Sequence, residues 1–198
     1  MNFFIRKILG PYFTSDQWAN YIVKETAELA GKVFNDGHFQ KLAKVKDLEQ
    51  IEKDRIFNEV QVSGIVYCML FIEQRRKHLG EKRSALWREV VQKIPGTFCG
   101  WLSELGIERE YVDIWKKLIG LRLNEYQEGI FEMRDAMEKG LADDLREDIK
   151  ELFYGLESVA IGGMLHITRG KSKPGDPLKR HMMTWLTVLQ ADLAKKVR

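Results

Sequence analysis

Proline is almost absent from the interior of this chain. The four prolines stand at positions 11, 95, 174 and 177, so the stretches 12–94 and 96–173 contain none. A β-sandwich of similar length normally carries more prolines and has turn clusters at short spacing. Apolar residues instead recur with helical period along most of the chain. We therefore predict an all-α, single-domain bundle of six to seven helices, mostly antiparallel, with one or two long helices and every proline at a helix boundary.

The composition is that of a folded domain. Hydrophobic residues make up 44% of the 198 positions and charged residues 31%, which excludes disorder as the main state because such a chain can bury enough apolar surface. This length favours one domain covering residues 1–198. No apolar run approaches the ~18 residues of a membrane span, so we expect no transmembrane segment.

The two cysteines, Cys68 and Cys99, each stand among apolar or aromatic neighbours. Two cysteines are too few for a disulfide scaffold, so we expect two buried free thiols. That usage favours a reducing compartment, and we predict a cytoplasmic protein.

Local signals predict where the helices begin and end. Thr14 and Gln17 have the spacing of a capping box, and Asp176-Pro177 combines an N-cap with proline at the first helical position. Pro95 followed by glycine predicts a helix end. The segment 47–79 is apolar on nearly all sides, which is typical of a central helix. The expected helices cover 14–33, 47–79, 82–94, 97–105, 108–139, 141–168 and the segment from 177 onward, with a loop at 41–46.

Glycines interrupt two of the longer predicted helices. The helix at 108–139 would be about 48 Å long, so we expect a kink near Gly120 or Gly129, or else an end that projects and packs on another chain. Gly155, Gly162 and Gly163 each disfavour a helix and indicate either close approach by another helix or a kink.

Sequence motifs for catalysis or metal binding are missing. The chain has no His-Glu-x-x-His, Glu-x-x-His or Cys-x-x-Cys motif, no Gly-x-Ser-x-Gly elbow and no glycine-rich phosphate loop. Four carboxylates share one helix face, which we interpret as a solvated surface: Glu125, Glu128, Glu132 and Asp135. We predict no cofactor and no metal, and no catalytic residue can be named.

One histidine lies on an apolar helix face. His166 follows the three- and four-residue spacing of Leu152, Leu156 and Val159, and we expect it to be satisfied at the edge of the core. An enzyme with a pocket between helices is the alternative. The candidate pocket would then contain His166, Glu157, Tyr67 and Cys68.

The net charge of +3 conceals strong segregation along the chain. Residues 75–88 have six Lys or Arg and one Glu, and residues 166–198 have eight Lys or Arg and two Asp, whereas residues 125–151 have ten acidic and four basic side chains. The segment 169–175 is a basic linker ahead of a helix N-terminus that suits an anion. The candidate anion- or partner-binding residues are Arg75, Arg76, Lys82, Arg83, Arg169, Lys171, Lys173, Lys179 and Arg180.

Three functions remain open at this stage. The leading hypothesis is a non-enzymatic helical protein that binds a macromolecular partner, as a homodimer, because charge is segregated and catalytic motifs are missing. The alternatives are the enzyme above and an anion or nucleic-acid binder that uses the basic clusters.

The N-terminal segment 1–13 is apolar around Arg6 and Lys7, and we expect it to pack on the bundle or a second subunit rather than on a membrane interface.

Overall fold

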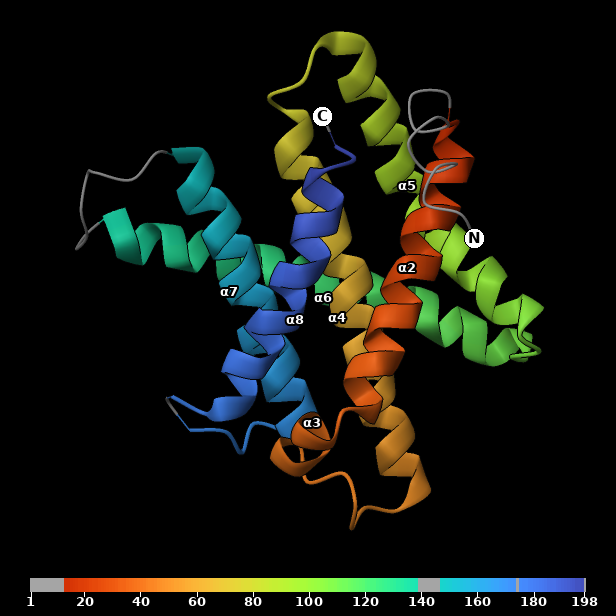
Figure 1. Cartoon of the computed structure of the whole chain (residues 1–198), viewed down its shortest axis with the longest axis vertical. Helices are drawn as coiled ribbons and strands as arrows, with labels where there is room; N and C mark the ends of the chain where they lie inside the picture. Colours follow the sequence, from red (N-terminus) through yellow and green to blue (C-terminus); the bar gives the residue numbers. More distant parts are fainter. Residues whose placement is uncertain (1–12, 139–146, 174, 198) are drawn as a thin grey trace.

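A computed structural model of the chain describes residues 13–138, 147–173 and 175–197 (Figure 1). These residues form seven α-helices and no strand, so the predicted all-α bundle is confirmed. The helices are α2 Ser15–Asn35, α3 Gly37–Leu42, α4 Gln50–Arg76, α5 Glu81–Glu104, α6 Arg109–Glu138, α7 Glu147–Thr168 and α8 Pro177–Ala194.

The bundle is arranged around α4. Helices α2, α5 and α7 run antiparallel to α4, and α8 runs antiparallel to α7 (Figure 1). Fourteen residues of α4 are buried, on all sides of the helix, as its apolar sequence predicts. By length and composition α4 also meets the criterion for a membrane span, but 78% of its most apolar window is buried inside the bundle.

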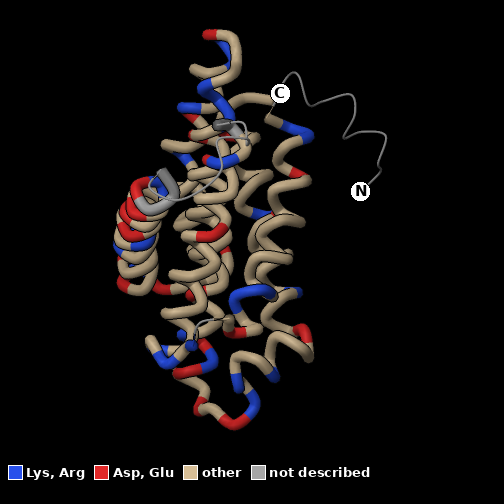
Figure 2. The backbone as a smooth tube through the Cα atoms, turned by 90° about the vertical axis from the view of Figure 1, so that its left-hand side faces the viewer, with Lys and Arg blue, Asp and Glu red and all other residues tan. Residues whose placement is uncertain are grey.

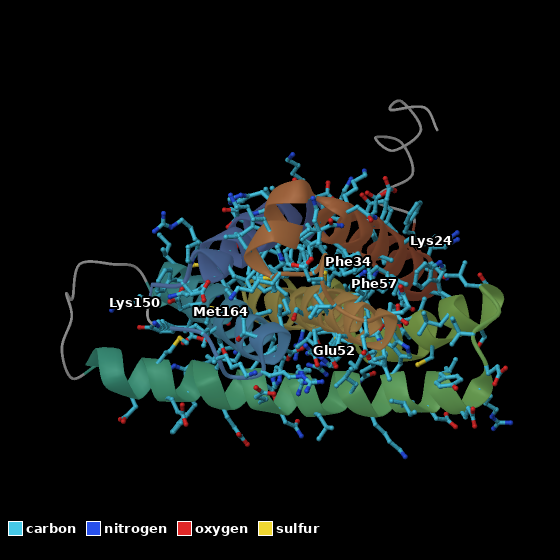
Figure 3. The ribbon with its side chains drawn as sticks, turned by 90° about the horizontal axis from the view of Figure 1, so that it is seen from below. Lys24, Phe34, Glu52, Phe57, Lys150 and Met164 are labelled. Carbon is cyan, nitrogen blue, oxygen red and sulfur yellow. The ribbon has the colours of Figure 1, made fainter. Side chains whose placement is uncertain are left out.

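Helix α6 differs from the other long helices in direction. It lies across one face of the bundle, and Figure 3 shows it as one continuous helix along the base of the molecule. The kink predicted near Gly120 or Gly129 is therefore wrong. One side of α6 is buried through Val112, Ile119 and Tyr126, which pack against the bundle.

Two predicted helix starts are confirmed in atomic detail. The Gln17 backbone N–H donates to Thr14 Oγ1 at 3.3 Å and the Thr14 backbone N–H donates to Gln17 Oε1 at 2.9 Å, which completes the capping box. The Leu178 backbone N–H donates to Asp176 Oδ1 at 2.9 Å, with Pro177 at the first helical position.

The boundary predicted at Pro95 is wrong, because α5 continues through it and joins the two expected helices. Proline removes one backbone hydrogen bond from a helix interior, at a cost of ~3 kcal/mol. Val90, Ile94, Phe98 and Leu102 recur at helical spacing on both sides of it, and all four are buried. Burying a side chain of this kind contributes ~1.5–3 kcal/mol, so the continuous apolar stripe outweighs the lost bond.

The segment between α2 and α4 also differs from prediction. Helix α3 occupies Gly37–Leu42, and α4 begins at Gln50 rather than at residue 47. Asp36 explains the short helix, because its side chain accepts a hydrogen bond from the Phe39 backbone N–H at 2.8 Å and Phe39 is fully buried. The chain then turns through Lys44, whose φ of 54° lies in the left-handed region.

Close helix approach is confirmed at two of the three α7 glycines. A Cβ atom at Gly162 would lie 2.3 Å from Tyr126 Cε1 of α6, and one at Gly163 would lie 2.8 Å from Ser63 Oγ of α4. A Cβ at Gly155 would meet no atom within 4 Å. The glycines at 162 and 163 therefore let α7 contact α4 and α6 directly, whereas no such close contact is made at Gly155.

Candidate functional site

The four residues of the candidate pocket point to different partners. The His166 ring Nε2 lies 2.6 Å from Glu125 Oε1 on α6, and Glu157 forms an ion pair with Lys179 on α8. The Tyr67 hydroxyl donates to Gln190 Oε1 at 2.5 Å. The structure therefore does not bring these side chains together as one catalytic group.

Both cysteines are free and buried, as predicted. Burial raises the pKa of the Cys68 thiol to about 12, and its hydrogen bond with Thr26, at 3.2 Å, only partly opposes that shift. Burial also raises the pKa of Cys99. A thiol with such a pKa stays protonated at neutral pH, so Cys68 is a packing residue and not a nucleophile.

The carboxylates of α6 do not converge on a metal. Glu125 is engaged by Arg122 at 3.2 Å and by His166, whereas Glu128, Glu132 and Asp135 are exposed. Figure 2 shows acidic residues gathered along the C-terminal part of α6. Within the part of the chain that the structure describes, no three His, Cys, Asp or Glu side chains are placed to hold a metal ion.

The two basic clusters lie at opposite ends of the bundle (Figure 1). The first surrounds the turn from α4 to α5, where Arg76 forms an ion pair with Glu73 and Lys82 and Arg83 are exposed. Arg75 Nε is buried there and has no hydrogen-bond partner within the described part of the chain. This cluster therefore cannot join the second one in a single binding surface.

The second cluster surrounds the turn from α7 to α8 and is partly neutralised by its neighbours. Arg169 forms an ion pair with Glu52, and Lys179 forms one with Glu157. The exposed cations of this cluster are Arg169, Lys171, Lys173 and Arg180. Part of the positive charge that is concentrated in this segment of the sequence is therefore neutralised by acidic side chains of other helices.

A row of apolar side chains faces solvent on the N-terminal half of α6. Tyr111 is 52% exposed, Ile114 58% and Leu121 62%, and Leu118 between them is half-buried. These four residues, which we call the α6 stripe, follow one another at spacings of three, four and three residues. Leu105 and Ile107, in the turn before α6, are also exposed.

The α6 stripe continues in sequence as the acidic face. After Leu121 the same spacing leads to Glu125, Glu128, Glu132 and Asp135, so one line along α6 is apolar in its first half and acidic in its second. Alternating spacings of three and four residues keep side chains on one face of a helix.

The spacing of apolar residues in the sequence does not reveal this stripe. It does not distinguish Tyr111 and Leu121, which are exposed, from Tyr126, which is buried. One signal in the sequence could have revealed the stripe. Extending the three- and four-residue spacing of the carboxylates backward from Glu125 reaches Leu121, Leu118, Ile114 and Tyr111.

Comparisons of the chain with protein-family models, with curated proteins and with solved structures return no match.

Proposed function

We propose that this protein acts by binding another macromolecule rather than by catalysis, and that its α6 stripe and the exposed turn before α6 pair with the same surface of a second copy to form a homodimer. The exposure of Tyr111, Ile114 and Leu121 in one row is the observation that carries the proposal. Single exposed apolar residues are common, but a contiguous row on one helix marks an interaction surface.

The spacing of the stripe suits a helix as the partner. Apolar side chains at alternating three- and four-residue intervals form the seam of a coiled coil, in which each side chain inserts between side chains of the facing helix. From Tyr111 to Leu121 the stripe is about 15 Å long. Such a contact is at the small end of specific interfaces, so we expect dissociation in the micromolar range.

The acidic half of α6 favours an antiparallel dimer. Parallel pairing would place Glu125, Glu128 and Glu132 beside the same residues of the partner, where like charges repel. In an antiparallel pair centred between Tyr111 and Ile114, the two copies of Glu125 are about 37 Å apart along the helix axis. That separation is several times the Debye length of about 8 Å, so the repulsion is screened.

This register also pairs opposite charges. Tyr111 faces the partner's Ile114, and Leu118 faces the turn at the partner's Ile107. Glu110 then lies beside the partner's Lys117, and the two-fold axis repeats that pair on the other side. Glu110 and Lys117 are both exposed on α6 and flank the stripe on the side away from the bundle.

The test is the molar mass of the full chain in solution, measured by light scattering and by sedimentation velocity. At about 100 µM we expect a mass near twice the 23.1 kDa of the chain. Ile114→Glu places two like charges at the centre of the interface and should give a monomer at this concentration. Asn124→Glu adds the same charge to α6 beyond the paired stretch and should leave the dimer intact. A monomeric parent protein, or a dimer that tolerates Ile114→Glu, would overturn the proposal.

The register has its own test. Glu110→Lys and Lys117→Glu each place like charges opposite one another and should weaken the dimer severalfold, whereas the double variant restores the pairing and the affinity. If the double variant instead loses as much dimer affinity as the two single variants together, this register is wrong, but the proposal of a dimer is not contradicted. The cytoplasmic location expected from the two free cysteines stays a prediction.

A further inference from the structure

A cavity of about 230 Å³ lies between α4, α6 and α7, on the opposite half of α7 from Gly162 and Gly163. Tyr67 and Phe71 of α4 line it, with ring centroids 6.3 Å apart, together with Ile130 of α6 and Leu152 of α7. Its volume is about 1.5 times the ~150 Å³ of an engineered apolar cavity that holds benzene. The cavity therefore has room for one small molecule with an apolar body.

Gly155 keeps this cavity open. The residue is buried and lines the cavity, yet a Cβ atom there would meet nothing within 4 Å. The other buried glycines of the described chain, Gly64, Gly162 and Gly163, each have a side-chain atom within 2.8 Å of that position. Glycine inside a helix costs stability relative to alanine, and an unfilled cavity costs more. Packing therefore accounts for the other three glycines and not for Gly155.

The charged groups around the cavity leave one cation without an ion-pair partner. Glu73 is held by Arg76, which does not line the cavity, and Glu151 is held by Arg134, whose Nε donates to Glu151 Oε1 at 2.8 Å. Lys77 also lines the cavity, is exposed, and has no ion pair among the described residues. The cavity thus combines an apolar wall with several polar side chains, among them an ammonium group that has no ion pair among the described residues.

We propose that this cavity is a binding site for a small carboxylate with an apolar body, of the arylacetate or medium-chain fatty acid type. The body lies against Tyr67, Phe71 and Leu152, where it displaces water from apolar surface. The carboxylate accepts a charge-assisted hydrogen bond from Lys77 Nζ. This site is separate from the α6 stripe and does not depend on dimer formation.

The proposal can be tested by titrating the ¹⁵N-labelled full chain with phenylacetate and recording amide chemical shifts. We expect saturable shifts at residues that line the cavity, in the millimolar range or tighter. The uncharged 2-phenylethanol and the Lys77→Gln variant with phenylacetate should each bind about tenfold more weakly. Octanoate should compete for the same residues. Shifts confined to other residues, or no saturation, would overturn the proposal.

Filling the cavity provides the second arm. Gly155→Leu places a side chain in the empty space and should abolish the phenylacetate shifts, whereas Gly100→Leu, on an exposed part of α5 with nothing within 4 Å, should leave them unchanged. Unchanged binding by a folded Gly155→Leu protein would contradict the assignment. Lys77 is exposed, so Lys77→Gln should fold even where Gly155→Leu does not. Equal binding of phenylacetate by Lys77→Gln and by the parent chain would also overturn the proposal.

Discussion

The two halves of α7 contain the same unfavourable residue for opposite reasons. In the C-terminal half, which we call the packed half, Gly162 and Gly163 let Tyr126 and Ser63 approach the helix backbone. In the N-terminal half, the cavity half, Gly155 borders empty space. Glycine therefore marks close packing at one end of the helix and a retained cavity at the other, and sequence cannot distinguish the two.

Polar contacts follow the same division. Beside the packed half, the Tyr126 hydroxyl lies 3.2 Å from Ser63 Oγ, and the Ser158 hydroxyl donates to the Tyr126 carbonyl oxygen at 2.8 Å. Arg122 of α6 donates to the Glu59 carboxylate of α4 through two nitrogens, at 2.6 and 3.0 Å. The corresponding ion pair beside the cavity half, between Arg134 and Glu151, borders the cavity.

The largest expected effect contrasts these two ion pairs. The Glu59 side chain is only 8% exposed, so Arg122→Met leaves a buried carboxylate without its partner and should lower the free energy of unfolding by about 3 kcal/mol. Arg134 is 39% exposed and Glu151 13%, so this pair is less buried than the first one, and Arg134→Met should cost less, about 1–2 kcal/mol. Urea unfolding at neutral pH measures both, and equal losses would remove the distinction between the halves.

The second prediction is that glycine-to-alanine substitutions change the free energy of unfolding in opposite directions in the two halves of α7. Gly162→Ala introduces a Cβ that would lie 2.3 Å from Tyr126 Cε1, so the ring must move, and we expect a loss of about 1–3 kcal/mol. Gly155→Ala meets no neighbour and should gain about 0.5–1 kcal/mol through helix propensity alone. Chemical unfolding of both variants is the measurement. A gain at both positions would mean that α7 does not pack closely at either end.

The features predicted well from sequence depend on neighbouring residues in the chain. Thr14 with Gln17 and Asp176 with Pro177 form their caps within one helical turn, so spacing alone is sufficient. The central place of α4 follows from a helix that is apolar on all sides. Pro95 was predicted wrongly because a local penalty was weighed without the long-range burial of Ile94 and Phe98.

The candidate site could not be predicted from the sequence because its contacts join residues that are far apart in the chain, and sequence spacing does not reveal such contacts. His166 contacts Glu125, 41 residues earlier, and this pairing determines what surrounds His166. The α6 stripe was hidden because two apolar faces share one helix, and only the packing of Ile119 and Tyr126 against the bundle shows which face remains exposed. The cavity at Gly155 is a gap between three helices and has no sequence signature.

The smallest expected effect concerns the C-terminal end of the packed half of α7. Arg55 donates to the carbonyl oxygens of His166 and Ile167 at 2.6 and 3.0 Å, and Glu52 accepts from Arg55 at 3.0 Å and from Arg169. Free carbonyl groups at a helix C-terminus attract cations, so this arrangement anchors α7 to α4. Burial would raise the pKa of Glu52, but the hydrogen bonds and charges of Arg55 and Arg169 outweigh burial and hold it below 4.5.

A carboxylate with a lowered pKa in the folded state binds fewer protons there than in the unfolded chain. Its contribution to stability is therefore complete above pH 4.5 and is lost as the pH falls through the folded pKa. Glu52→Gln should lower the thermal unfolding midpoint at pH 7 and narrow the difference between pH 7 and about pH 3. The exposed Glu128→Gln should do neither. An acid-induced loss as large in Glu52→Gln as in the parent chain would show that the Glu52 carboxylate does not contribute to anchoring this end of α7.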